Sequence, residues 1–217
     1  NLNFRSGAIV ANGTDVKVGT GGRIDLFASN GCPDVVVDVV GFFYGSKPVG
    51  PGGFVGTAPR RLLDSRESGG CLNGVRDLIV AGGSTSIPGD AAAVALNVTV
   101  VDPQGGGFLT TFPSGAPRPL ASSLNYVAQD VVANNVTVKV GERGSVSLHA
   151  SNGCPDVVVD VVGYYTGGVP AGEGAFVGVT PNRLLDTREG DAASCVIGSV
   201  EVRTDGPTSP EIGRAHV

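Results

Sequence analysis

Tryptophan and methionine are absent from the sequence, and aromatic residues make up only 6% of its 217 positions. Apolar runs are short as well, and none approaches the roughly 18 residues that a membrane-spanning helix requires. No window shows the sustained i, i+3, i+4, i+7 apolar spacing of an amphipathic helix. The net charge of −5 is not concentrated in acidic or basic blocks. This removes the electrostatic basis for binding nucleic acid or anionic lipid.

Catalytic and metal-binding patterns are missing too. The sequence contains two histidines and no GxSxG, HExxH or phosphate-loop motif. It also lacks the CxxC pairs and Cys/His clusters that form zinc sites. We therefore expect no enzymatic activity, no cofactor and no metal ion.

Turn-forming residues and valine are abundant. The 35 glycines and 14 prolines favour many short strands joined by tight turns. The stretch SNGCPDVVVDVVG begins at Ser29 and again at Ser151, an offset of 122 positions. The same offset relates three further motifs, which are VKVG (16–19 and 138–141), FVG (54–56 and 176–178) and RLLD[ST]R (61–66 and 183–188). A repeat of this length is a domain-sized module and not one unit of a solenoid.

Two glycine- and proline-rich stretches divide the chain, GSKPVGPGG (45–53) and TGGVPAGEG (166–174). We expect residues 1–44 to be the C-terminal part of a truncated module and residues 54–165 to be one complete module. Residues 175–210 are then the N-terminal part of a truncated third module. The last residues, EIGRAHV (211–217), look like a translated sequencing-library adapter and are set aside as a processing scar, His216 included.

Eight segments of the complete module read as strands, with turn sequences such as DPQGGG, PSGAPRP and GERG between them. The expected strands are 61–66, 78–80, 93–101, 107–112, 122–127, 136–140, 145–150 and 156–164. Short strands at this spacing predict an all-β fold, an antiparallel β-sandwich of jelly-roll or immunoglobulin-like type. A closed β-barrel is the alternative.

The motifs and their order resemble a known family. RLLDTR, AVALNVTVVDP, GFLTTFPSG, RPLASSLNY, VKVG and DVVVDVVGYY are similar to a repeat module of secreted actinobacterial proteins. In that family the module occurs in tandem or is appended to extracellular hydrolases and other exported proteins. The resemblance covers nearly the whole chain and implies an extracellular location and a modular architecture. It brings no catalytic residues with it.

Each copy of the repeated strand carries an aspartate within its valine run, Asp38 in the first and Asp160 in the second. Side chains alternate between the two faces of a strand, and here valines occupy both faces. The pattern predicts a central, largely buried strand. A carboxylate in such a strand needs a hydrogen-bonded partner.

The RLLD[ST]R motif supplies candidate partners, namely Arg61, Asp64 and Arg66 in the complete module and Arg183, Asp186 and Arg188 in the next copy. We predict that Asp160 is buried, ionised and paired with Arg61 or Arg66, with Asp38 in the same role in the truncated module. Two alternatives remain open. One is a Ca²⁺ site formed by Asp160, Asp64 and a neighbouring carboxylate, which the flanking arginines disfavour, and the other is an exposed aspartate without a role.

Four cysteines in a chain that resembles exported proteins predict disulfide bonds. If pairing stays within modules, Cys71 bonds Cys154, and Cys32 and Cys195 have lost their partners to truncation. If pairing crosses the linkers, the bonds are Cys32–Cys71 and Cys154–Cys195. We favour the first arrangement because a domain usually stabilises itself.

These observations favour a non-catalytic structural or spacer module of a secreted or cell-surface bacterial protein, with neighbouring modules of the same chain as its partners. The alternative is a module that binds polysaccharide or a cell-wall polymer and is appended to a secreted hydrolase. Its ligand-facing aromatics would be Tyr126, Tyr164 and Tyr165. His149 occupies the position that Phe27 fills in the preceding repeat, so we expect a half-buried packing residue and not a catalytic base.

Overall fold

The structure is a computed structural model that describes residues 4, 6–13, 16, 18–43, 51–169, 175–189 and 195–204. Its regular elements are strands and one short 3₁₀ turn, η1. They are β1 (Arg23–Ala28), β2 (Val36–Phe43), β3 (Phe54–Asp64), β4 (Gly74–Ile79), β5 (Ala93–Val101), β6 (Gly107–Pro113), β7 (Leu124–Tyr126), β8 (Val131–Lys139), η1 (Glu142–Gly144), β9 (Ser145–Ala150), β10 (Asp156–Tyr165), β11 (Phe176–Asp186) and β12 (Gly198–Arg203).

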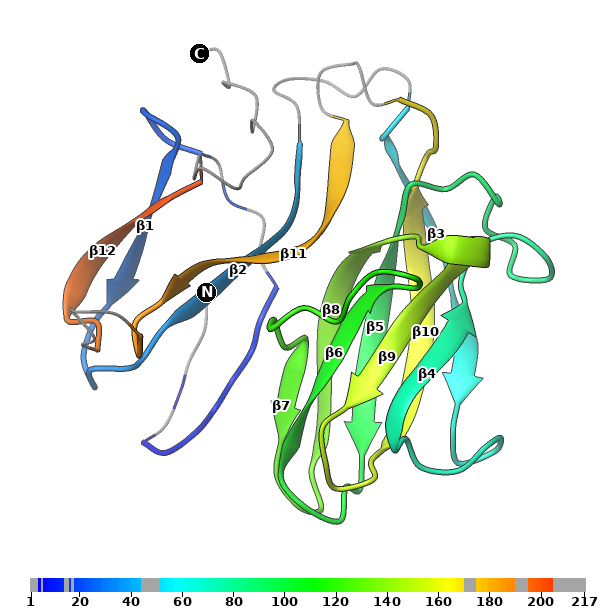
Figure 1. Cartoon of the computed structure of the whole chain (residues 1–217), viewed down its shortest axis with the longest axis horizontal. Helices are drawn as coiled ribbons and strands as arrows, with labels where there is room; N and C mark the ends of the chain where they lie inside the picture. The colour runs from blue at the N-terminus through cyan, green and yellow to red at the C-terminus, as the bar shows by residue number, and fades with distance from the viewer. Residues whose placement is uncertain are drawn as a thin grey trace.

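Residues 54–165 form two four-stranded antiparallel sheets that pack face to face (Figure 1). One sheet has the strand order β3-β10-β5-β8 and the other β4-β9-β6-β7. Neither sheet closes on itself, so the predicted all-β sandwich is confirmed and the closed barrel is wrong. We call residues 54–165 the complete module.

The strands of the complete module pair in a nested order. The first strand, β3, pairs with the last, β10, and the next strand inward, β4, pairs with β9. Further inward, β5 pairs with β8 and β6 pairs with β7. A chain folded back on itself in this way, with successive pairs in alternating sheets, has the strand order of a jelly roll.

The core lies between the two sheets and is built by period-2 alternation. On β5, Leu96, Val98 and Val100 point inward and are fully buried, while the residues between them are partly exposed. Val157 and Val159 of β10, the neighbouring strand in the same sheet, point into the core in the same way. As predicted, β10 is a central strand, with β3 on one side and β5 on the other.

The first strand differs from the predicted 61–66. It begins earlier, at Phe54, and it ends at Asp64. It stops there because the Asp64 carboxylate accepts a hydrogen bond from the backbone N–H of Arg66 at 3.2 Å. The backbone N–H of Glu67 also donates to the Asp64 carbonyl at 3.2 Å. These contacts turn the chain out of the sheet, as aspartate side chains commonly do.

The segments that precede and follow the complete module pair with each other. The strand β2 pairs with β11, and β1 pairs with β12, both antiparallel. These are the repeat equivalents of the β10–β3 and β9–β4 pairs of the complete module. We call this four-stranded unit, β1, β2, β11 and β12, the flanking lobe; Figure 1 shows it beside the complete module.

The nested topology explains this pairing. Because β3 and β10 are neighbours, the complete module begins and ends at one place, where Phe54 lies opposite Tyr165. The chain therefore leaves the module in two adjacent segments. Across the linkers the pairing resumes, with Phe43 of β2 opposite Phe176 of β11.

Candidate functional site

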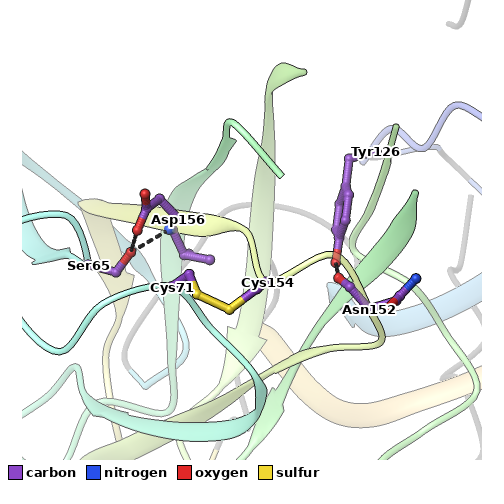
Figure 2. The surroundings of a disulfide bond; sticks show 7 residues. Ser65, Cys71, Tyr126, Asn152, Cys154 and Asp156 are labelled. Atoms are coloured by element: carbon purple, nitrogen blue, oxygen red, sulfur yellow. Dashed lines mark hydrogen bonds between the residues drawn. A yellow bond between two sulfur atoms is a disulfide. The ribbon is translucent and has the colours of Figure 1, made fainter. Parts of the chain in front are cut away.

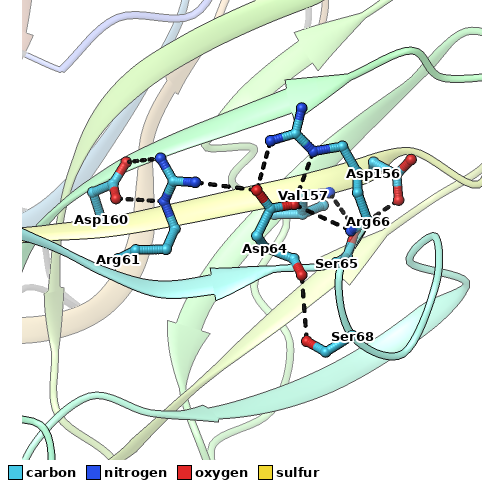
Figure 3. Close-up of polar contacts among 8 residues, drawn as sticks. All are labelled: Arg61, Asp64, Ser65, Arg66, Ser68, Asp156, Val157 and Asp160. Atoms are coloured by element: carbon cyan, nitrogen blue, oxygen red, sulfur yellow. Dashed lines mark hydrogen bonds and ion pairs between the residues drawn. The ribbon is translucent and has the colours of Figure 1, made fainter.

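The aspartate in the valine run lies directly opposite the first arginine of the RLLDSR motif. Asp160 of β10 is the register partner of Arg61 of β3. Arg61 Nε donates to Asp160 Oδ1 at 2.6 Å, and Nη2 donates to Oδ2 at 3.3 Å (Figure 3). Two parallel bonds of this kind are the geometry in which arginine holds a carboxylate and lysine cannot.

Asp64 joins the two arginines of the motif. It accepts hydrogen bonds from Arg61 Nη1 at 3.1 Å and from Arg66 Nε and Nη2 at 2.8 and 2.5 Å. Its side chain is only 4% exposed. The hydrogen bonds from Arg66 lower the pKa of Asp64 from its usual value to about 2, against a smaller upward effect of burial. Charges therefore alternate along the row Asp160, Arg61, Asp64 and Arg66.

The same row recurs in the flanking lobe. Arg183 donates to Asp38 through Nε and to Asp186 through Nη1, the latter at 2.8 Å. Arg188 donates to Asp186 through Nε and Nη2 at 2.8 and 2.6 Å, and these bonds hold the pKa of Asp186 well below its usual range. The pairing that the sequence suggests within one module is thus made in the lobe by residues from two different repeats.

The prediction that Asp160 is buried is wrong. The sequence predicts a buried carboxylate, but the Asp160 side chain is 21% exposed and that of Arg61 is 50% exposed. The aspartate lies on the outer face of the sheet, since the inner face of β10 carries valines. Among the described residues no group of three or more potential metal ligands comes together. Asp160 and Asp64 are instead bridged by a guanidinium.

The residue between Asp64 and Arg66 has a role that the sequence reasoning missed. Ser65 is buried, and its hydroxyl accepts from the Val157 N–H at 2.8 Å and donates to Asp156 Oδ1 at 2.7 Å. In the flanking lobe the Thr187 hydroxyl accepts from the Val35 N–H at 2.8 Å. The sequence did contain a signal for this role, because the two copies of the RLLD[ST]R motif carry serine and threonine at this position and both side chains have a hydroxyl.

The two disulfides lie at equivalent positions of the complete module and the flanking lobe. Cys71 bonds Cys154 in the complete module (Figure 2) and Cys32 bonds Cys195 in the flanking lobe. The expected within-module bond is therefore present. Cys32 and Cys195 are not left without partners, which corrects that prediction, and the alternative pairs Cys32–Cys71 and Cys154–Cys195 do not occur.

The structure explains why the repeated stretch ends in glycine. A Cβ atom on Gly163 would lie 2.5 Å from Phe54 Cζ, and one on Gly41 would meet the ring of Phe176 more closely still. Each FVG phenylalanine therefore packs on the bare backbone of its partner strand.

The candidate ligand-facing tyrosines are not exposed. Tyr126 is buried in the core, and its hydroxyl donates to the Asn152 carbonyl at 2.6 Å (Figure 2). Tyr164 is half-buried against the core, and Tyr165 is buried between the complete module and the flanking lobe. The three tyrosines do not form a surface platform. His149 is half-buried beside Phe108, as expected, and burial lowers its pKa.

Four aromatic rings meet where the complete module joins the flanking lobe. The Tyr165 ring lies 4.3 Å from Phe176 and 5.1 Å from Phe54, centroid to centroid, and Phe43 lies 5.2 Å from Phe176. By the repeat offset, Phe43 is the equivalent of Tyr165 and Phe54 of Phe176, so each repeat contributes the same two positions. We call this cluster the aromatic junction.

Backbone hydrogen bonds fasten the linkers beside the aromatic junction. The Gly52 N–H donates to the Thr166 carbonyl at 2.8 Å, and the Thr166 N–H donates to the Gly53 carbonyl at 2.9 Å. The Phe176 N–H donates to the Gly52 carbonyl at 2.9 Å. Gly52 has φ +90°, and a Cβ on it would lie 2.7 Å from Ala175 Cβ. These parts of the glycine-rich linkers are thus ordered connections.

Replacing Asp160 by asparagine should lower the free energy of unfolding by about 1 kcal/mol, because a partly exposed pair contributes less than a buried one. Urea denaturation followed by circular dichroism measures the change. A double-mutant cycle with Arg61→Gln is the control. If the changes in unfolding free energy of the two single mutants simply add, the Asp160–Arg61 pair contributes nothing to stability.

Acid should weaken the fold through Asp64. Because its folded-state pKa is depressed to about 2, its stabilising effect is fully present above the unfolded pKa of about 4 and disappears as the pH falls toward 2. The difference in unfolding free energy between the wild type and Asp64→Asn should therefore shrink over this pH range. A difference that stays constant from pH 6 to about pH 2 would contradict the depressed pKa.

No protein-family model matches the chain, and no curated protein or solved structure matches it either. None of the helical segments in the described ranges is long and apolar enough to cross a membrane.

Proposed function

We propose that the chain is part of a non-catalytic array of sandwich modules that acts as a spacer in a secreted or cell-surface bacterial protein. The aromatic junction carries this proposal. It is built from equivalent positions of two repeats, Phe43 with Tyr165 and Phe54 with Phe176. Each repeat contributes one ring from its first strand and one from its last strand. Further copies can therefore be joined by the same contacts.

A spacer must also hold its modules at a fixed orientation. The linkers are fastened by backbone hydrogen bonds at Gly52, Gly53 and Thr166. A second contact lies away from the junction, where Arg183 Nη2 donates to the Leu120 carbonyl at 3.2 Å. Two separated contacts resist hinge motion between domains better than one linker does.

The extracellular location is supported by the two disulfides, because such bonds persist in oxidising compartments and are rare in the cytosol. The resemblance to modules of secreted actinobacterial proteins points the same way. The alternative, a polysaccharide-binding module, loses its candidate platform because Tyr126 and Tyr165 are buried.

The test is whether the complete module and the flanking lobe tumble as one body. We expect backbone ¹⁵N relaxation to give one rotational correlation time for both parts of the wild-type chain. In Phe176→Ala, which removes the central ring of the aromatic junction, the two parts should relax separately. Leu120→Ala, an exposed side chain whose contact with Arg183 uses only the backbone, is the matched control.

Two results would refute the spacer. One is independent tumbling of the two parts in the wild-type chain, since a spacer with a free hinge sets no distance. The other is retention of the chain on cellulose, chitin or peptidoglycan in a pull-down at physiological salt, which would favour the binding module instead.

A further inference from the structure

Asparagine followed by glycine is a chemically reactive pair, and two such pairs lie in the complete module. They are Asn73–Gly74 and Asn152–Gly153. The backbone nitrogen of the second residue can attack the side-chain amide carbon of the asparagine, and glycine favours this because it has no Cβ to obstruct the approach. Both glycines have a left-handed backbone, with φ of 80° and 74°. The two pairs are therefore alike in sequence and in glycine conformation, and only their surroundings differ.

The Asn152–Gly153 pair is held by hydrogen bonds on several sides. The Asn152 amide nitrogen donates to the Gly106 carbonyl at 3.2 Å, and the Asn152 carbonyl accepts from the Tyr126 hydroxyl at 2.6 Å (Figure 2). The Gly153 carbonyl accepts from the Gln104 N–H at 2.7 Å. Attack on the amide carbon requires the asparagine side chain to turn onto the Gly153 nitrogen, which breaks its bond to Gly106. These contacts therefore protect the pair.

The Asn73–Gly74 pair has no such restraints. Asn73 is exposed and lies just before β4, which begins at Gly74. None of the side-chain hydrogen bonds within the described ranges involves Asn73. A Cβ on Gly74 would meet no atom within 4 Å, so the backbone has open space beside it where a ring would form. The Asn73 side chain can therefore turn onto the glycine nitrogen without losing a contact.

The next repeat shows that the fold needs the glycine at this position and not the asparagine. Gly198 begins β12, the equivalent of β4, with φ 76° and the same open space beside it. The residue before it is Ile197, which is 80% exposed. An isoleucine side chain offers no hydrogen bond, so the start of this strand does not depend on a polar side chain.

We propose that Asn73 is a site of spontaneous covalent modification. The Gly74 backbone nitrogen loses its proton and bonds to Asn73 Cγ, the Cγ–Nδ2 bond breaks, and ammonia leaves. Water then opens the resulting cyclic imide at either of its two carbonyls. One opening gives aspartate, and the other gives isoaspartate, in which the main chain runs through Cγ. The net change converts an amide and water into a carboxylate and ammonium, and it needs no enzyme or cofactor.

The structural effect of this modification is confined to a short segment. On one side the Leu72 N–H donates to the Pro155 carbonyl at 2.7 Å, next to the Cys71–Cys154 bond. On the other side Gly74 lies opposite Ala150 in the β4–β9 pair. Isoaspartate lengthens the chain by one carbon between these fixed points and adds a negative charge. We expect the module to stay folded while the first residues of β4 loosen from β9. The inference stands on local geometry and holds whether or not the modules act as a spacer.

The main experiment compares the two asparagines in one sample. The folded full chain is incubated at mildly alkaline pH in ¹⁸O-labelled water, which marks conversion during the incubation, and is sampled over time. Digestion and mass spectrometry with fragmentation that separates aspartate from isoaspartate give the rate at each site. Conversion at Asn73 should be about tenfold or more faster than at Asn152, because ring closure at Asn152 must first break hydrogen bonds. Both aspartate and isoaspartate should appear at position 73.

The same measurement in urea with the disulfides reduced is the first control. Each asparagine is followed by glycine, so the two should convert at similar rates once the fold is removed. Asn73→Gln, whose longer side chain would have to close a larger ring, should abolish conversion at position 73 and leave the slow rate at Asn152 unchanged. Asn73→Ile, which copies the residue of the next repeat, should keep the urea midpoint of the wild type.

Three results would overturn the proposal. The first is equal conversion of Asn73 and Asn152 in the folded chain. The second is a rate difference that persists in urea, since the fold would then not be its cause. The third is formation of aspartate at position 73 without isoaspartate, because opening of a cyclic imide gives both.

Discussion

Replacing Cys71 and Cys154 together by alanine is expected to lower the free energy of unfolding of the complete module by about 4 kcal/mol. The bond joins positions 83 residues apart, and a cross-link of this span removes much of the conformational entropy of the unfolded chain. The same bond fixes the loop after β3 against the start of β10, next to the Ser65 hydrogen bonds (Figure 2). Urea denaturation followed by circular dichroism measures the loss.

The matched control is the double replacement of Cys32 and Cys195, the equivalent bond in the flanking lobe. It should leave the slow hydrogen exchange of β5 and β10 amides unchanged while amides of β1 and β2 exchange faster. Equal losses in both parts from either replacement would show that the complete module and the lobe unfold as one cooperative unit. The disulfides would then not act locally.

Leu148→Ala is expected to lower the unfolding free energy by about 2–5 kcal/mol, the range for removing a large aliphatic side chain from a well-packed core. Leu148 is fully buried on β9, between the two sheets of the complete module. Its loss leaves a cavity that the surrounding valines and leucines fill only in part. The shift of the urea midpoint at unchanged slope gives the value.

The repeat provides the control at the identical position one module earlier. Leu26 is the equivalent of Leu148 but is only half-buried, because the described residues of the flanking lobe include no equivalents of β5 and β6. Leu26→Ala should therefore cost less than half as much and should affect only the lobe. A cost equal to that of Leu148→Ala would mean that the lobe interior is closed in solution.

Agreement between sequence and structure is closest where a local pattern repeats at a fixed offset. Alternation along the valine run placed β10 at the centre of a sheet with its valines inward. The need of a carboxylate for a partner pointed from Asp160 to the RLLDSR motif, and the structure joins it to Arg61. These inferences rest on side-chain period and charge, which a sequence displays directly.

The sequence by itself determined the all-β class and the repeat length. It favoured the Cys71–Cys154 bond over the pairing across the linkers, and it pointed to the RLLDSR motif as the partner of Asp160 without choosing between Arg61 and Arg66. Only the tertiary structure decided the nested strand order, because every strand shows the same alternation and none shows which neighbour it takes. It also decided that Cys32 bonds Cys195. That contact joins segments 163 positions apart, and it depends on both ends of the complete module emerging side by side at Phe54 and Tyr165. Long-range proximity of this kind is set by the path of the whole chain and not by any local pattern.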